Sequence, residues 1–145
     1  MMKKTLLLLA ALALTIHSAQ ATNGAWTGTT DGNWNVDSNW TGAFFPDGGN
    51  TATFNADVAN STISMNSEAI NVHILFTGSN TGSYTFNDGG GFLSVGGITI
   101  TSDVTGAVTQ TFNSRLNYAG GNSSITNDSA TAVLDFKGGI LNQST

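Results

Sequence analysis

The sequence lacks cysteine, has a single proline, and only 9% of its 145 residues are charged. Without cysteine the chain cannot use disulfide bonds, which stabilise many small secreted domains. Beyond residue 21 it also lacks any stretch in which apolar residues recur at the three-to-four-residue spacing of an amphipathic helix. These absences exclude a disulfide scaffold and disfavour a helical fold, so the core must be built from short strands.

Positive charge is equally scarce. Lys3, Lys4, Arg115 and Lys137 are the four basic residues, against nine aspartates and glutamates. Binding to nucleic acid requires lysine and arginine to neutralise phosphates, and anionic membrane surfaces attract proteins through the same residues. The composition therefore excludes both nucleic acid and an anionic membrane surface as binding partners.

The N-terminus has the three parts of a secretory signal in their usual order. Met1–Lys4 is basic, Leu6–Ile16 is an apolar run, and Ala19–Ala21 is a small-x-small cleavage site. A helix that spans a bilayer needs about 20 apolar residues, so this run is too short. We predict that residues 1–21 are a signal peptide removed after Ala21. The mature chain is then secreted or displayed on the outer cell surface, with no integral membrane segment.

The rest of the chain has the composition of an all-β protein with many polar turns. Gly, Asn, Thr and Ser make up just over half of it, yet β-branched and aromatic residues recur at intervals too short for a disordered chain. Apolar and polar residues alternate in Ala69–Phe76, Ile98–Thr101 and Ala132–Lys137, which predicts half-buried strands. The residues expected to face inward are Ile70, Val72, Ile74, Phe86, Ile98, Ile100, Phe112, Leu134 and Phe136.

One tripeptide recurs along the chain. Thr53–Asn55, Thr85–Asn87 and Thr111–Asn113 all read Thr-Phe-Asn, and Asp135–Lys137 is a degenerate fourth copy. The phenylalanines at 54, 86, 112 and 136 lie 32, 26 and 24 residues apart. Repeats of 20–50 residues are typical of solenoids and arrays. We therefore predict a β-solenoid, with a β-sandwich of short strands as the alternative.

The segment from Trp26 to Phe54 carries an ordered set of motifs. They are Trp26–Gly28, Gly32–Trp34, Asn39-Trp40, Pro46–Gly49 and Thr51–Phe54. This order resembles the N-terminal part of bacterial surface proteins with autotransporter-associated β-strand repeats. The resemblance implies a right-handed parallel β-helix passenger with a surface-structural or adhesive role, and it brings no catalytic residues.

Further along, Phe92–Ile100 is similar to one of the repeat strands of that family. We accordingly expect three parts, with residues 1–21 as the signal peptide, 22–55 as a Trp-rich N-terminal cap and 56–145 as β-solenoid repeats. A solenoid needs a polar cap at its end, and none follows Ile140-Leu141. We therefore expect the sequence to be the beginning of a longer protein, truncated at its C-terminus.

Few residues could carry acid–base chemistry. His73 lies on the polar face of an alternating strand, without the G-x-S-x-G motif of a serine nucleophile. Hydrolysis of a glycoside needs a pair of carboxylates, for which Glu68, Asp88, Asp103 and Asp135 are the candidates. The better interpretation of these four residues is that they are solvent-exposed carboxylates in turns. We expect no catalytic residues, no cofactor and no enzyme activity, the alternative being the N-terminal part of a β-helical polysaccharide-degrading enzyme.

One segment resembles a calcium loop, in which oxygen ligands recur at every second position. The candidate ligands are Asp31, Asn33, Asn35 and Asp37. Val36 occupies the position of the invariant glycine of such loops, and Gly42 that of the bidentate glutamate. Calcium therefore stays a secondary hypothesis for this segment, beside a cap in which Trp34 and Val36 face inward.

Trp26, Trp34 and Trp40 have two possible roles. They could cover the first turn of the solenoid, because an uncovered end exposes apolar side chains and unpaired strand edges. Alternatively they could form an exposed sugar-stacking platform, which would make the chain a carbohydrate-binding domain. Large aromatic side chains are mostly buried, so the cap is favoured. The expected partners are extracellular polysaccharide or other surface proteins.

Overall fold

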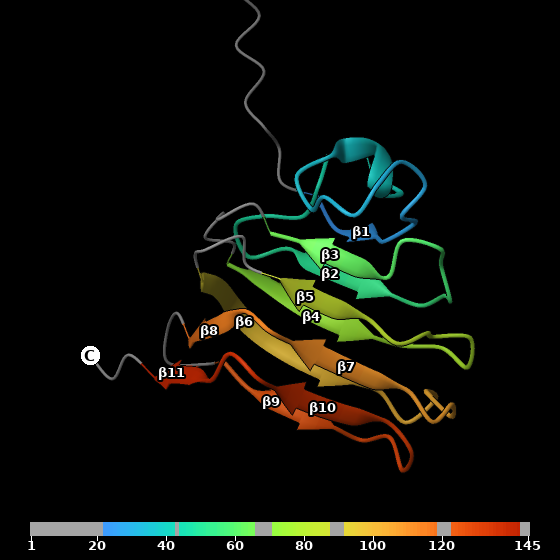
Figure 1. Cartoon of the computed structure of the whole chain (residues 1–145), viewed down its shortest axis with the longest axis vertical. Helices are drawn as coiled ribbons and strands as arrows, with labels where there is room; N and C mark the ends of the chain where they lie inside the picture. Colours follow the sequence, from blue (N-terminus) through green and yellow to red (C-terminus); the bar gives the residue numbers. More distant parts are fainter. Residues whose placement is uncertain (1–21, 43, 66–70, 88–91, 119–122, 143–145) are drawn as a thin grey trace, which may run out of the picture.

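The protein is a parallel β-solenoid of about four turns, as predicted (Figure 1). The computed structural model describes residues 22–42, 44–65, 71–87, 92–118 and 123–142. The predicted signal peptide, residues 1–21, and the expected core residue Ile70 lie outside the described residues. A short 3₁₀ helix, Asp37–Asn39 (η1), is the one helical element in the part that the structure describes.

Seven strands form the larger sheet. Its order is β1-β2-β4-β6-β8-β11. β8 pairs with the first half of β6 and β9 with its second half, so β8 and β9 follow one another along the same edge of β6. The strands are β1 (Gly24–Ala25), β2 (Thr51–Phe54), β4 (Val72–Phe76), β6 (Phe92–Ile100), β8 (Arg115–Tyr118), β9 (Ile125–Asn127) and β11 (Ile140–Asn142).

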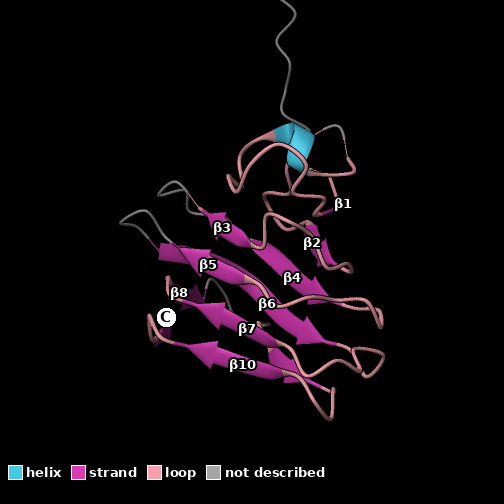
Figure 2. Ribbon diagram, turned by 45° about the vertical axis from the view of Figure 1, so that its right-hand side comes forward, coloured by secondary structure: helices cyan, strands magenta, loops and turns pink. Residues whose placement is uncertain are grey.

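The second sheet has four strands in the order β10-β7-β5-β3. They are β3 (Thr62–Ser64), β5 (Thr85–Asn87), β7 (Thr109–Phe112) and β10 (Val133–Phe136). The chain crosses from one sheet to the other and back in each turn, and Figure 2 shows these strands stacked below the cap. Every pairing between the named strands is parallel, which rules out the antiparallel β-sandwich.

The core consists of files of apolar side chains, in which each residue stacks on its register partner one turn away. In the four-stranded sheet the file is Ile63, Phe86, Phe112 and Phe136, and in the larger sheet Ala52, Ile74, Ile98 and Ile125. The expected inward residues Val72, Ile74, Phe86, Ile98, Ile100 and Phe112 are fully buried. Leu134 and Phe136, in the last turn, are partly buried against the same core.

The Thr-Phe-Asn repeat was partly misassigned from the sequence. Its copies at 85–87, 111–113 and 135–137 lie on adjacent strands of the four-stranded sheet, with their phenylalanines in register. The copy at 53–55 instead ends β2 in the other sheet. The first-turn partner of Phe86 is Ile63, in the segment Thr62–Ser64. This explains why the first spacing of 32 residues exceeded the others, since it joined strands of different sheets.

The turns that follow β4 and β6 are joined through a carboxylate. Asp103 accepts hydrogen bonds from the hydroxyls of Thr101 and Thr77, the latter at 3.1 and 3.3 Å. The bond from Thr101, with a backbone bond from Gly78 and the bond from Thr77, holds the pKa of Asp103 below its usual 3.8. Consecutive turns of the solenoid are thus connected by hydrogen bonds between their loops as well as between their strands.

We expect this carboxylate to make stability depend on pH. Its pKa is lower in the folded than in the unfolded chain, so its contribution is present above pH 3.8 and is lost as pH falls further. Asp103→Asn should therefore reduce the loss of stability between pH 5 and pH 2.5, measured as the urea midpoint at each pH. The exposed neighbour Ser102 supplies the control Ser102→Ala, and identical pH profiles for the wild type and Asp103→Asn would contradict the role.

Candidate functional site

The three tryptophans lie together over the first turn. Their exposed fractions are 1% for Trp26, 0% for Trp34 and 4% for Trp40. The ring of Trp40 meets the other two edge-on, with centroids 5.0 Å from Trp26 and 4.6 Å from Trp34. Phe54, at the end of β2, lies beneath all three at 6.0–6.4 Å. Such edge-to-face packing stabilises aromatic clusters beyond the area they bury.

Each indole N–H donates a hydrogen bond to a backbone carbonyl. Trp26 donates to the carbonyl of Asn60 at 2.9 Å, Trp34 to that of Pro46 at 3.1 Å, and Trp40 to that of Trp34 at 2.8 Å. A buried indole needs such a partner because an unpaired polar group away from water is costly. The Trp-rich N-terminal cap is therefore confirmed. A sugar platform needs exposed ring faces, which these buried rings do not offer.

The cap is continuous with the solenoid rather than a separate unit. Its strand β1 pairs with β2, so that Gly24 and Ala25 lie beside Ala52 and Thr53. Asn33 forms an isolated parallel bridge with Ser64 at the end of β3. The predicted cap, residues 22–55, thus includes β2, which is a full member of the seven-stranded sheet.

The segment that resembles a calcium loop is held by a buried amide. Asn39, fully buried, accepts the backbone N–H groups of Thr30 and Asp31 at 3.0 and 3.2 Å. Its side-chain NH₂ donates to the carboxylate of Asp31 and to the carbonyl of Asn33, at 2.8 and 2.9 Å. One side chain therefore fixes the path of residues 30–33. Sequence reasoning missed this role because an asparagine in a polar segment carries no signal of burial.

Two of the proposed calcium ligands, Asp31 and Asn33, belong to this network. Asp31 accepts three hydrogen bonds, from the backbone and side-chain N–H groups of Asn33 and from Asn39, all at 2.8 Å. The backbone bond from Asn33 is the main reason that the pKa of Asp31 lies below its usual value. Asp37 accepts the backbone N–H of Phe45 at 2.9 Å. The carboxylates of Asp31 and Asp37 thus have a structural use, and calcium binding here stays an untested hypothesis.

We expect Asn39→Ala to destabilise the protein by about 1–3 kcal/mol, because it removes the partner of two part-buried backbone N–H groups and one of the three hydrogen bonds to the carboxylate of Asp31. Chemical unfolding followed by circular dichroism measures the change. Asn80→Ala, at an exposed turn position, is the matched control and should change stability by less than about 0.5 kcal/mol. Equal midpoints for the two variants would contradict the assigned role of Asn39.

The residues considered for catalysis lie on different elements. His73 faces outward on β4, where its ring lies against Gly97 of β6; a Cβ at Gly97 would be 2.8 Å from the imidazole Nδ1. Asp103 lies in the turn after β6, and Asp135 lies on β10 beside Lys137. Glu68 and Asp88 lie outside the described residues. Within the described ranges, no three His, Asp or Glu side chains gather as metal ligands would.

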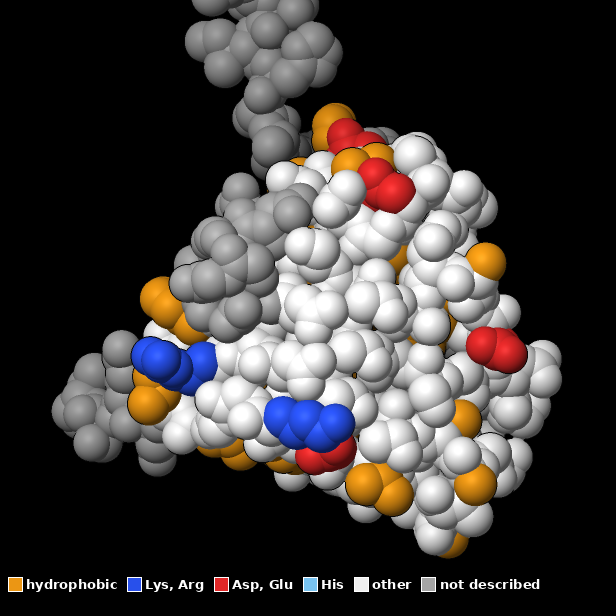
Figure 3. Space-filling view, in the orientation of Figure 1, with side chains coloured by type: hydrophobic (Ala, Val, Ile, Leu, Met, Phe, Trp, Pro, Cys, Tyr) orange, Lys and Arg blue, Asp and Glu red, His pale blue; other side chains and the backbone are white. Residues whose placement is uncertain are grey.

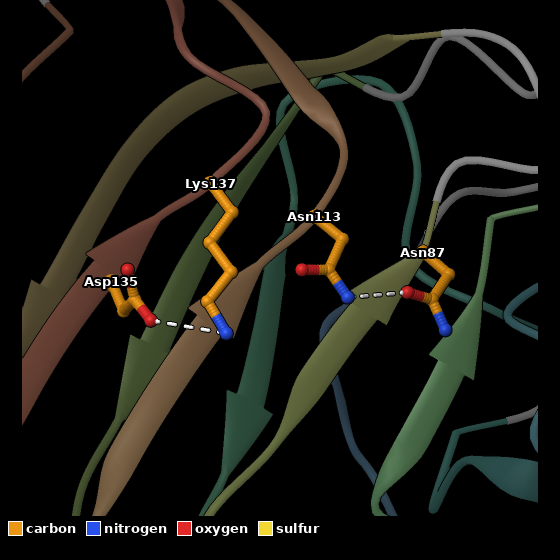
Figure 4. Close-up of polar contacts among 4 residues, drawn as sticks. All are labelled: Asn87, Asn113, Asp135 and Lys137. Carbon is orange, nitrogen blue, oxygen red and sulfur yellow. Dashed lines mark hydrogen bonds and ion pairs between the residues drawn. The ribbon is translucent and has the colours of Figure 1, made fainter.

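The outer face of the four-stranded sheet carries polar side chains in columns. One column runs through Thr62, Thr85, Thr111 and Asp135, and the next through Ser64, Asn87, Asn113 and Lys137. Asn113 donates a side-chain hydrogen bond to Asn87 at 2.9 Å across neighbouring turns (Figure 4). Figure 3 shows few apolar or charged side chains in the middle of this view; a basic and an acidic group lie side by side in its lower part, and a second basic group lies at its left edge. We call these two columns the polar face.

Comparisons with protein-family models, curated proteins and solved structures gave no match. In the described part of the chain, no helix has the length and apolar character that crossing a membrane requires.

Proposed function

We propose that this chain is an exported structural protein of the cell surface or extracellular matrix, without catalytic activity. Its solenoid would act as a rigid, adhesive element that contacts extracellular polysaccharide or other surface proteins. The leader-like residues 1–21 support export, and the autotransporter-like motifs support display at the outer surface. The absence of cysteine suits this role, because stacked turns supply stability without disulfides.

The polar face is the observation that carries this proposal. Its hydroxyl and amide groups repeat once per turn on a regular sheet, so they can meet a repetitive ligand at several points. Parallel strands lie about 4.8 Å apart, which sets the spacing of these groups. Many weak contacts at fixed spacing give avidity without a deep pocket.

The adhesive surface can be tested by placing a charge on one face at a time. Cells displaying the full chain should attach to polysaccharide-coated surfaces, and Thr85→Lys on the polar face should lower attachment several-fold. Thr99→Lys, on the outer face of the seven-stranded sheet, is the matched control and should leave attachment unchanged. Equal attachment by cells with and without the protein would contradict an adhesive role.

Export has a separate test. Expression of the full sequence in a bacterium should yield a mature protein outside the cytoplasm whose N-terminal sequence begins at Thr22. Deletion of residues 2–21 should retain the protein inside the cell. A chain recovered from the medium or surface with Met1 still present would contradict the signal-peptide assignment.

A further inference from the structure

The turn that leads into β2 holds a side-chain carboxyl group against the backbone nitrogen of the next residue. Gly48 donates its N–H to Oδ1 of Asp47 at 2.7 Å. Gly48 and Gly49 have φ angles of 56° and 90°, in the left-handed region that favours glycine, and all three residues are exposed. Glycine has no side chain to shield its nitrogen, so the carboxyl group and the peptide nitrogen of Asp47-Gly48 meet at an open position on the surface.

Such a contact allows a reaction within the backbone. When the Gly48 nitrogen bonds to Cγ of the protonated Asp47 side chain, one carboxyl C–O bond breaks, and that oxygen leaves as water with its own proton and the N–H proton. The product is a five-membered succinimide ring. Groups that are held close together react faster than free ones, because less entropy is lost on reaching the transition state. The N–H···O contact provides this proximity, since Cγ is bonded to the accepting oxygen.

The turn also polarises the carbonyl group at which the ring can reopen. Asn50 donates its backbone N–H to the carbonyl oxygen of Asp47 at 3.3 Å, and its side-chain NH₂ to the same oxygen. Water that adds to this carbonyl carbon breaks its bond to the Gly48 nitrogen, which takes a proton, and the chain then continues through Cγ as isoaspartate. Donors on a carbonyl oxygen stabilise the negative charge that develops there during such an addition. Opening at Cγ instead restores aspartate.

Two other dipeptides of the same type in the described ranges lack this arrangement. At Asp31-Gly32 the carboxylate accepts three hydrogen bonds, none of them from Gly32. The backbone there is also tightly packed, because a Cβ at Gly32 would lie 2.4 Å from the carbonyl oxygen of Thr62. At Asn23-Gly24 the side-chain oxygen accepts the backbone N–H of Thr51 at 2.7 Å. Both side chains are thus bound to partners other than the nitrogen that follows them.

We propose that Asp47 is a site of spontaneous modification, at which the folded chain converts aspartate to isoaspartate through a succinimide formed with Gly48. The reaction needs no enzyme, and water is its only co-reactant. The product carries one extra methylene group in its backbone immediately after Pro46, whose carbonyl oxygen accepts the indole N–H of Trp34. The modification therefore alters the chain next to the tryptophan cap.

Peptide mapping of the full chain after prolonged incubation in a warm, mildly acidic buffer tests this. Electron-transfer fragmentation in a mass spectrometer distinguishes isoaspartate from aspartate, and the succinimide is lighter by one water. In the folded protein we expect isoaspartate at position 47 to accumulate at least several-fold faster than at position 31. In a parallel sample unfolded in guanidinium chloride, where neither segment is held, the two Asp-Gly dipeptides should react at similar rates.

Asp47→Glu is the matched control, because it keeps the charge but has to close a six-membered ring, which forms far more slowly. Conversion at position 47 should disappear in this variant, and conversion at position 31 should stay as in the wild type. A folded wild-type chain in which position 47 stays unmodified, or in which the rates at positions 31 and 47 have the same ratio as in the unfolded chain, would overturn the proposal. So would undiminished conversion at position 47 of Asp47→Glu. None of these outcomes bears on export or adhesion.

Discussion

Trp34→Ala is expected to lower the free energy of unfolding by about 3–5 kcal/mol, as truncation of a large buried aromatic side chain usually does. Trp34 is fully buried, contacts Trp40 and Phe54, and its backbone carbonyl accepts the indole N–H of Trp40. The substitution therefore leaves a cavity at the centre of the cap. A loss of this size is a large part of the 5–15 kcal/mol that stabilises a typical domain.

Fluorescence reports on the cap alone, because the chain has three tryptophans and all of them lie there. In the wild type we expect blue-shifted emission that iodide quenches poorly. In Trp34→Ala the remaining emission should shift to longer wavelength and become accessible to iodide. Trp34→Phe, which retains a ring, should lose less stability than the alanine variant. Readily quenched, solvent-like emission from the folded wild type would contradict the cap and favour a sugar platform.

Phe112→Ala is expected to have an effect of similar size, about 3–5 kcal/mol. Phe112 is fully buried between Phe86 and Phe136 in the middle of the aromatic file, so the cavity left by alanine is enclosed on both sides. Denaturant unfolding followed by circular dichroism gives the change in stability. The far-ultraviolet spectrum should stay that of a β protein wherever the variant still folds.

Two further variants test whether the loss of stability depends on how deeply the side chain is buried. Thr99→Ala, on the outer face of β6, should change stability by less than about 0.5 kcal/mol. Phe136→Ala should cost less than Phe112→Ala, because Phe136 is only partly buried. Equal costs for Phe112→Ala and Thr99→Ala would contradict the assigned core.

Much of the fold could be predicted from the sequence because a solenoid repeats its pattern. Alternation placed Ile74 and Ile98 inside, and they prove to be register partners on neighbouring strands. The Thr-Phe-Asn motif identified β5 and β7 as equivalent strands, since both present Phe inward and a polar pair outward. The position of the tryptophans ahead of the repeats was enough to predict a cap.

What the sequence could not provide was the relation between the two sheets. Thr53–Asn55 has the same residues as Thr85–Asn87, yet the two segments lie in different sheets. A residue pattern typical of a strand does not indicate to which of the two sheets that strand belongs. The structural role of Asn39 could not be predicted from the sequence for a related reason. Three of its four partners are backbone groups, of residues 30, 31 and 33, which no pattern of side chains reveals.

The central claim, a parallel in-register solenoid, is tested most directly by cross-linking between introduced cysteines, which are the only thiols in this cysteine-free chain. Thr85 and Thr111 are register partners on adjacent strands of the polar face. Thr53 belongs to β2 of the other sheet. We predict that a short bifunctional thiol reagent joins Thr85→Cys to Thr111→Cys rapidly within one folded chain, and Thr53→Cys to Thr85→Cys slowly or not at all. Equal rates for the two pairs, or faster joining of the second, would contradict the solenoid.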